Sequence, residues 1–274
     1  MADNSQSLTG SIRRTFERMS LGFRSIGARV HERPILLLGN QKSGTTAIAA
    51  LLAETAGLPI TLDLKKEFTD PVIDRLRTEA LTMKDFVERH RLDFSRPMIK
   101  EPSLTPFYRE LANFFPESKF VIVVRDPRDN IRSILNRLGI PGNLDSIPAE
   151  ARQKITRAWQ LILDGEWLGI SGTHYIDRLA HRWNFTTDIY LANADEIILS
   201  RFEDFLADKP GEIKRLADAL DLPARNDIRN KVDIQFQPAG DHTVTWPDFF
   251  GENLERIESI CAERMEAMGY EGSR

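Results

Sequence analysis

The sequence predicts an α/β protein of three layers, in which helices cover both faces of a central parallel sheet. Short apolar runs typical of strands alternate with helical segments along the 274 residues, and this alternation favours a parallel sheet. The run at 120–124, FVIVV, is apolar at every position, as expected for a strand that is buried on both faces.

Apolar runs place the expected strands, and glycine or proline residues mark where helices stop. Strands are expected at 35–39, 98–100, 120–124 and 196–200. Helices are expected at 47–56, in at least one segment near 70–90, and at 107–115, 129–138, 151–165, 175–191, 211–220 and 252–268. Gly57 and Pro59 end the first of these helices and Pro116 closes the one at 107–115, because neither residue type continues a helix readily.

The chain is expected to form one domain, at 33–274, preceded by an amphipathic helical extension at 1–32. In the extension, apolar residues recur at helical spacing, opposite an arginine-rich face, at positions 8, 12, 16, 19, 23, 26 and 30. Such a helix packs on its own domain or on a partner subunit, or it lies on an anionic membrane surface. Peripheral membrane contact through residues 8–30 is therefore an alternative to simple packing.

Composition and charge argue against several classes of protein. The formal net charge is −4, whereas a general nucleic-acid binder usually carries a basic excess. The chain has one cysteine, Cys261, so neither an intrachain disulfide nor a multi-cysteine metal site can form. No apolar run approaches the roughly 20 residues that span a bilayer. We expect a cytoplasmic protein with no metal and no transmembrane segment.

The segment 39–46, GNQKSGTT, lies between a strand and a helix and predicts an anion-binding loop. Backbone N–H groups at such a turn and at the helix N-terminus cradle phosphate oxygens. A Walker-type loop carries its lysine directly after the last glycine, but here Thr45 follows Gly44 and the lysine stands earlier, at Lys42. Lys42 can instead reach the oxygen that joins a 5′-phosphate to its leaving group. A plain glycine turn between strand and helix would show the same pattern.

A second charged motif follows the strand at 120–124. Arg125 lies at the edge where open α/β sheets bind ligands, and Ser133 comes about two turns later. Together with Arg128 and Arg132, Arg125 suits the recognition of a phosphate that does not react. The alternative is a charged loop with local Asp–Arg pairs.

Together the two motifs resemble those of sulfotransferases that use 3′-phosphoadenosine-5′-phosphosulfate (PAPS). The first is similar to the family's 5′-phosphosulfate loop, PKSGTT, and the second to its 3′-phosphate segment, in which a serine follows an arginine by eight residues. The resemblance covers about 33–136 and returns at 196–205, where IILSRFEDF is similar to the family's RYEDL. It implies a P-loop-like sulfotransferase fold and PAPS as co-substrate, bound by Lys42, Ser43, Gly44, Thr45, Thr46, Arg125, Ser133 and Phe202.

The sequence departs from the family pattern at three places. Gln41 replaces the common proline of the loop, as in heparan sulfate sulfotransferases. Ala47 replaces the tryptophan that stacks on adenine in cytosolic members. The C-terminal R-K-G phosphate clamp is absent, and the segment near Gly240 is only a faint echo of it. The adenine contacts and part of the 3′-phosphate site are therefore left open.

Sulfuryl transfer to a hydroxyl needs a base within hydrogen-bond reach of the acceptor's proton. The segment 65–68, KKEF, is similar to the K-E-x-x-F segment of glycan sulfotransferases, whose glutamate is the base. The resemblance thus implies that role for Glu67, with Asp63 and Glu101 as rivals. Without the resemblance, Glu67 reads as a solvated surface carboxylate.

The resemblance also implies in-line displacement at sulfur. Lys42 would stabilise the leaving oxygen and Lys100 would steady the sulfuryl oxygens, so the chemistry is positioning plus electrostatics. The acceptor is expected to be a small molecule or a glycan, between walls at 139–174 and 226–250. Aromatic residues there stack on a sugar or phenol, or belong to the core: Trp159, Trp167, Tyr175 and Trp246.

Two other classes compete with an active sulfotransferase. A P-loop nucleotide kinase or NTPase would need a lysine after Gly44 and a magnesium-binding aspartate, and the sequence offers neither. A non-catalytic protein that binds the product nucleotide, 3′-phosphoadenosine-5′-phosphate (PAP), would place its carboxylates away from the phosphate loop.

Overall fold

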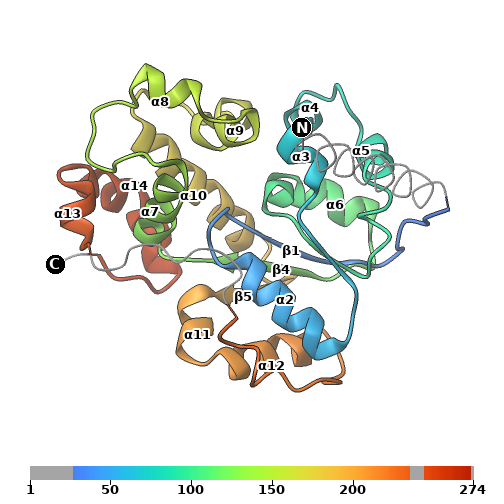
Figure 1. Ribbon diagram of the computed structural model, residues 1–274. Coiled ribbons are helices and arrows are strands. Elements are labelled where there is room, and N and C mark those ends of the chain that lie inside the picture. The colour runs from blue at the N-terminus through green and yellow to red at the C-terminus, as the bar shows by residue number, and fades with distance from the viewer. Residues whose placement is uncertain (1–26, 235–243, 273–274) are drawn as a thin grey trace, which may run out of the picture.

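The computed structural model describes residues 27–234 and 244–272, and a sheet of five parallel strands forms its centre (Figure 1). The strands are β1 (Ile35–Gly39), β2 (Ile60–Leu62), β3 (Met98–Lys100), β4 (Phe120–Val124) and β5 (Ile197–Arg201). Their order across the sheet is β2-β3-β1-β4-β5. Helices connect the strands and lie around the sheet, so the predicted α/β class with a central parallel sheet is confirmed.

Alternate residues of the strands supply two cores, one on each face of the sheet. Leu37, Val121 and Val123 face the helices α2 (Thr45–Ala56) and α12 (Lys209–Ala219). On the opposite face, residues such as Leu36 and Ile122 pack against α5 (Met83–Arg89) and α6 (Tyr108–Phe114). Both β1 and β4 are buried at all five positions, which explains their continuously apolar sequences.

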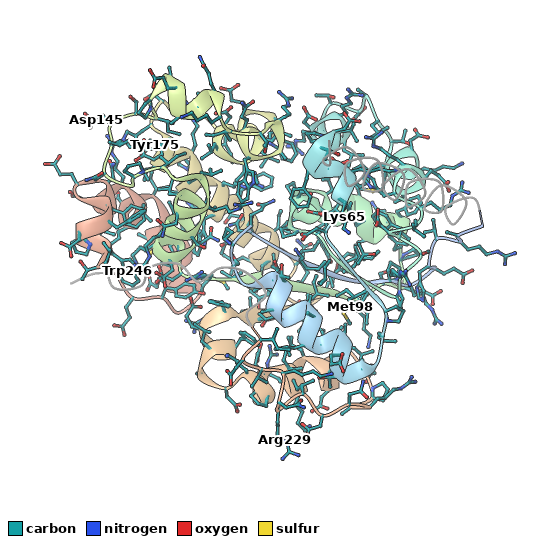
Figure 2. All side chains as sticks on the ribbon, in the orientation of Figure 1. Lys65, Met98, Asp145, Tyr175, Arg229 and Trp246 are labelled. Carbon is teal, nitrogen blue, oxygen red and sulfur yellow. The ribbon has the colours of Figure 1, made fainter. Side chains whose placement is uncertain are left out.

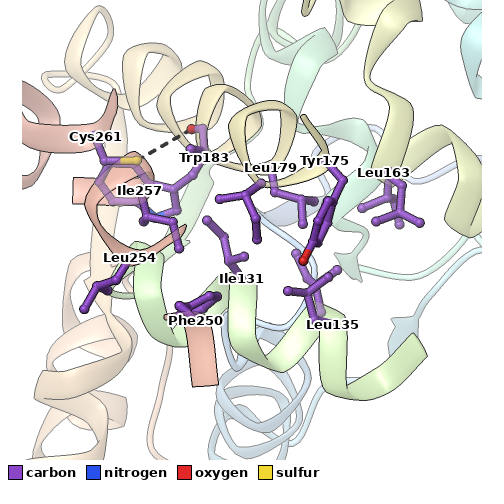
Figure 3. Close-up of a cluster of buried hydrophobic side chains, with 14 of the residues drawn as sticks. Ile131, Leu135, Leu163, Tyr175, Leu179, Trp183, Phe250, Leu254, Ile257 and Cys261 are labelled. Carbon is purple, nitrogen blue, oxygen red and sulfur yellow. Dashed lines mark hydrogen bonds between the residues drawn. The ribbon is translucent and has the colours of Figure 1, made fainter. Parts of the chain in front are cut away.

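A third core lies beside the sheet and contains the one cysteine. It joins α7 (Pro127–Leu138), α10 (Tyr175–Leu191), α13 (Trp246–Phe250) and α14 (Asn253–Ala267). Figure 3 shows Cys261 among these side chains, where its thiol donates to the Ala180 carbonyl at 3.7 Å. Burial raises the pKa of Cys261 far above its usual range, so this thiol is a packing group.

The expectation of at least one helix near 70–90 is confirmed, because the segment holds α4 (Ile73–Arg77) and α5, which begins where Thr82 caps Asp85 N. The short helix α3 (Lys65–Thr69) precedes them. Two other parts of the expected secondary structure were wrong. The helix expected at 151–165 is broken into α8 (Ala149–Gln153) and α9 (Arg157–Asp164), because Thr156 takes an extended conformation at the start of α9. The edge strand β2 was not expected from the sequence.

The remaining short elements complete the described chain. They are the 3₁₀ turns η1 (Pro102–Phe107) and η2 (Glu166–Leu168) and the helix α11 (Phe202–Ala207). Residues 1–26 lie outside the described residues, and with them most of the expected N-terminal helix; residues 28–30, its expected end, have no regular secondary structure. Among the described residues, no helix has the length and apolar character needed to cross a membrane.

The parallel register brings the strand ends that carry the motifs to one edge of the sheet. Leu37 of β1 pairs with Lys100, and Gly39 pairs with Val123 of β4. Val124 pairs with Arg201 at the end of β5. The phosphate loop, Lys100, Arg125 and Phe202 therefore follow strands whose carboxyl ends meet at the same edge, where open α/β sheets bind ligands.

Candidate active site

The loop at 40–44 turns sharply from β1 into α2. Lys42 and Gly44 both have positive φ, of 69° and 87°. Gly44 occupies the N-cap position of α2 and, as a glycine, has no side chain with which to cap this helix end. The first N–H groups of a helix have no partner within the helix, so the turn presents backbone donors and the positive end of the helix dipole to an anion.

Side chains from two other elements hold this loop in shape. From α7, Asn130 Nδ2 donates to the Gln41 carbonyl at 2.8 Å and to Ser43 Oγ at 3.0 Å. From α10, Thr186 donates its hydroxyl to Asn40 Oδ1 at 2.9 Å. The loop is therefore fixed from both sides before any ligand binds. Asn130 sits inside the second motif, but its sequence pattern did not reveal this supporting role.

Arg125, directly after β4, and Phe202, directly after β5, contact each other and the loop. Arg125 Nη1 donates to the Lys42 carbonyl at 3.2 Å, and its guanidinium carbon lies 4.7 Å from the centre of the Phe202 ring. A Cβ added to Gly44 would lie 2.1 Å from that ring, so the loop and Phe202 are in close contact. Arg125 is 7% exposed and its Nε has no hydrogen-bond partner among the described residues. Burial lowers the pKa of Arg125, and Asp129 partly offsets this.

The arginines of the second motif divide into different roles. Arg128 donates two hydrogen bonds to Asp126 and one to Glu258, at 2.6 to 2.9 Å, so local pairing describes it well. Arg132 donates to Asp129 Oδ1 at 2.6 Å and to a backbone carbonyl. Ser133 is half-buried on α7. Arg125 thus contacts the phosphate loop directly, through the Lys42 carbonyl.

A cavity of about 120 Å³ opens beside the loop. It is lined from the loop and α2, from the ends of β2 and β3, and from α3, α9 and α10. Its polar lining residues are Gln41, Lys42, Thr45, Thr46, Asp63, Glu67, Lys100, Glu101, Ser103 and Arg182. The three predicted catalytic residues and both rival carboxylates therefore face one space.

Lys42 enters the cavity from the loop as a half-buried side chain. Burial, followed by the positive charges of Arg137 and Arg125, lowers its pKa from the usual value. An anion that binds beside Lys42 is therefore stabilised, because its negative charge offsets both the repulsion among the cations and the loss of hydration of the ammonium group.

Lys100 and Asp63 form an ion pair at the opposite wall. Lys100 is 2% exposed at the end of β3, and its ammonium group donates to Asp63 Oδ1. Asp63 has a φ of 112°, which is uncommon for a residue with a side chain. Burial raises the pKa of Asp63, while Lys100 lowers it in part. The strained backbone places this carboxylate against the lysine.

Glu101 is engaged by its own neighbourhood. Its Oε2 accepts from Leu64 N at 2.8 Å, and its Oε1 accepts from the backbone N and hydroxyl of Ser103 at 3.0 and 2.7 Å. It is 5% exposed, and burial raises its pKa. Both oxygens thus hold the turn after β3 in place, which makes Glu101 a structural carboxylate.

Glu67 is buried at 6% exposure, contrary to its interpretation as a solvated surface group. Its Oε2 accepts from Val72 N and Ile73 N at 2.8 and 3.1 Å. Its Oε1 lies 2.9 Å from His90 Nε2. Both carboxylate oxygens of Glu67 therefore lie within hydrogen-bond distance of a partner.

His90 links Glu67 to the surface of the molecule. Its other ring nitrogen, Nδ1, lies 3.6 Å from Asp93 Oδ2, and the His90 side chain itself is fully buried. Burial alone would lower the pKa of His90, but Asp93 and Glu67 outweigh it and raise the pKa above 6.5. Sequence reasoning missed His90, because it lies 23 residues from Glu67 and neither residue type nor spacing marked the pair.

The aromatic residues proposed as acceptor walls divide between cavity and core. Trp159 and Trp167 line the cavity with Phe68, which is 50% exposed. Tyr175 and Trp246 belong to the third core instead, and Figure 2 shows them on α10 and α13, on the far side from Lys65. Within the described residues, 139–174 contributes to this cavity and 226–250 does not.

This architecture defines a class of protein: an α/β domain that binds a phosphorylated ligand at the carboxyl edge of its sheet. The sulfotransferase domain family matches residues 32–238, and the chain belongs to this family. The family resemblance of the two motifs is thereby confirmed, and the chain is an enzyme of the sulfuryl-transfer class.

Solved structures agree at the level of the fold. The chain is 13% identical to the sulfotransferase STF9 from Mycobacterium avium, over 94% of this chain and 82% of that one, with a TM-score of 0.50. It is 14% identical to mouse sulfotransferase SULT7A1 complexed with PAP, over 87% and 85% of the two chains, with a TM-score of 0.49. No curated protein matches the chain.

Proposed function

We propose that the protein transfers a sulfuryl group from PAPS to a hydroxyl or amine of a small-molecule or glycan acceptor. The observation that carries the proposal is the shared cavity: the phosphate loop with Lys42 opens into the same space as Lys100 and Glu67. A non-catalytic nucleotide-binding protein is expected to place its carboxylates away from the phosphate loop, whereas Glu67 lines the same cavity as the loop.

The residues at the sheet edge fit the two phosphate-bearing ends of PAPS. The uncapped N-terminus of α2 and the Thr45 and Thr46 side chains suit the 5′-phosphosulfate. Arg125, with its unpaired Nε, and Ser133 suit the 3′-phosphate. Phe202, between Arg125 and Gly44, offers an aromatic surface beside the nucleotide. Positive charge comes from lysine and arginine, so the proposed reaction uses no metal.

In the proposed reaction, the acceptor oxygen attacks sulfur in line with the bridging oxygen of PAPS. The acceptor O–S bond forms, the bond from sulfur to the bridging oxygen breaks, and PAP leaves with the electron pair. Lys42 stabilises the charge on the bridging oxygen, Lys100 orients the sulfuryl oxygens, and Glu67 Oε1 takes the acceptor's proton. His90, on the other side of Glu67, positions that carboxylate.

Asp63 is the second candidate for the base. It is more exposed than Glu67, and its ion pair with Lys100 puts it at the same cavity. Its Oδ1 accepts from the Lys100 ammonium group, so in this proposal Asp63 orients Lys100 and Glu67 is the base.

A transfer assay with sulfur-35-labelled PAPS tests the proposal. We expect label to move to hydroxyl acceptors in a panel of phenols, alcohols and sugars, in the presence of a chelator. Calorimetry should show that PAP binds without magnesium. Tight, magnesium-dependent binding of ATP, or PAP binding with no transfer to any class of acceptor, would contradict it.

A further inference from the structure

Arg182 is a buried cation in the cavity to which neither the sequence motifs nor the proposed reaction gives a role. It lies on α10, is 4% exposed, and lines the same cavity as Lys42 and Glu67. Its Nη2 donates to the side-chain oxygen of Gln41 at 3.1 Å. Its Nε and Nη1 have no hydrogen-bond partner among the described residues.

The charge of Arg182 is also uncompensated within the described part of the chain. No carboxylate of that part forms an ion pair with it, in contrast to Lys100, which pairs with Asp63. Burial alone lowers the pKa of Arg182 to about 10, with no contribution from a neighbouring charge. A buried guanidinium with two unused donor groups is costly to the folded protein, and such a cost is typical of a group whose partner is a ligand.

Arg182 contacts the phosphate loop through Gln41, the residue that precedes Lys42. Its helix, α10, packs against α9, and Trp159 and Ile162 of α9 line the same cavity. A fixed cation and an apolar surface therefore line one space.

We infer that Arg182 binds an anionic group of the acceptor, so that the natural substrate is a hydroxyl compound with an oxyanion on an apolar or aromatic body. The oxyanion is a carboxylate, phosphate or sulfate ester that accepts a charge-assisted hydrogen bond from Nε or Nη1, the donors of Arg182 that have no partner among the described residues. The apolar body lies against Trp159 and Ile162, and the hydroxyl then faces Glu67. This inference rests on the proposed sulfuryl transfer and adds the substrate class.

Matched acceptors that differ only in charge provide the test. The probes are hydroxy acids and their amides, such as 4-hydroxyphenylacetate and 4-hydroxyphenylacetamide, with longer alkyl and aryl pairs. Each is titrated by calorimetry into PAP-loaded protein, so that the nucleotide phosphate sites are occupied. Wild type should bind at least one acid roughly 10- to 100-fold more tightly than its amide, as expected for hydrogen bonds to a charged group. Arg182→Met should remove this preference.

Gln41→Leu is the matched control, because it removes the one hydrogen bond that Arg182 makes to the loop. If Arg182 merely supports the loop, the two variants behave alike and the inference is wrong. Thermal unfolding checks that both variants fold; Arg182→Met should be at least as stable as wild type, since an uncompensated buried charge is removed.

Two further results would overturn the inference without touching the proposed function. One is PAP binding and label transfer with no acid preference in any pair. The other is a loss of PAPS affinity, with PAP affinity unchanged, in Arg182→Met, which would place the sulfuryl group of PAPS on Arg182. The proposed function fails by a different readout, the absence of PAP binding or of transfer to all acceptors.

Discussion

Lys42 lies within the phosphate loop and Arg125 contacts it, but we propose different roles for the two cations. Lys42 lines the cavity in which the proposed transfer takes place, whereas Arg125 packs on the Phe202 ring, beside which we propose that the nucleotide binds. Lys42→Ala should lower kcat by about 100- to 1,000-fold, the usual loss for one donor to developing charge. Arg125→Ala should instead weaken PAP binding by roughly 10- to 100-fold. Steady-state kinetics with PAP calorimetry measures both, with the surface variant Lys65→Ala as control.

Glu67→Gln tests the base. The amide keeps the size of the side chain, and its oxygen can still accept from Val72 N and Ile73 N. We expect kcat to fall by about 100- to 10,000-fold while PAP affinity stays within a few-fold of wild type. Asp63→Asn should lower kcat less than Glu67→Gln does. If Asp63→Asn is the more damaging of the two, the base is Asp63.

His90 gives folding stability a pH dependence of known sign. Its pKa in the folded protein is raised above 6.5, so the folded state binds this proton more tightly than the unfolded state does. The stabilisation is fully present below about pH 6.5, the unfolded value, and is lost as pH rises through the folded pKa. Denaturant unfolding of wild type and His90→Gln should give a stability difference that shrinks over this range. A difference that grows with pH would contradict the assignment.

Among single residues, the sequence predicted those that belong to local motifs and missed those that tertiary packing brings to the site. Lys42, Lys100 and Glu67 follow strand ends or resemble a family segment, and they do line one cavity. Arg182 and His90 belong to no recognisable sequence motif. Helix packing brings each of them to the site, and a single arginine or histidine in a helical pattern predicts only a surface or core position.

The strand–loop–helix element built by β1, the loop and α2 depends on Gly44. This residue has a φ of 87°, and a methyl group there would lie 2.1 Å from the Phe202 ring. Gly44→Ala should cost a few kcal/mol of stability, about 1–2 from the left-handed backbone and about 1–3 from overpacking, and should weaken PAP binding. Thermal unfolding and calorimetry measure the two effects.

Gly139→Ala is the matched control for the backbone contribution. Gly139 also has positive φ, 66°, but no atom lies within 4 Å of an added methyl group. Gly139→Ala should therefore lose only the part of the stability that depends on the left-handed backbone, and its affinity for PAP should stay unchanged. Adding Phe202→Ala to Gly44→Ala should recover part of the lost stability. No recovery would mean that the ring contact is not the cause.

The elements that the sequence predicted best are those with a strong local pattern. β1 and β4 are apolar at every position and buried at every position, so their existence and bounds were read directly. β2 is too short to show a period, and the break between α8 and α9 falls in a helix-like sequence. Tertiary packing determines the secondary structure of such segments, and it leaves no pattern in the local sequence.

At the scale of the whole molecule, the proposed nucleotide site joins three separate strand–helix crossovers. The loop after β1, Arg125 after β4 and Phe202 after β5 meet through the contacts of Arg125 with the Lys42 carbonyl and the Phe202 ring. A ligand that bridges these segments should stabilise the domain as a unit, since it binds the folded state alone. The strand order could not be read from the sequence, yet it is what brings the two motifs together.

PAP should therefore raise the unfolding temperature by several degrees, and the 3′-phosphate should account for much of the shift. At a concentration of about 100 times Kd, binding contributes about 2.7 kcal/mol, and each kcal/mol shifts a domain of this size by roughly 2–4 °C. Adenosine 5′-phosphate, which lacks the 3′-phosphate, should give a smaller shift. Arg125→Ala should abolish the difference between the two nucleotides, whereas Lys42→Ala should leave it in place. ATP should stabilise less than PAP at equal concentration, with or without magnesium; a larger, magnesium-dependent shift with ATP would mean that this edge of the sheet binds a nucleoside triphosphate.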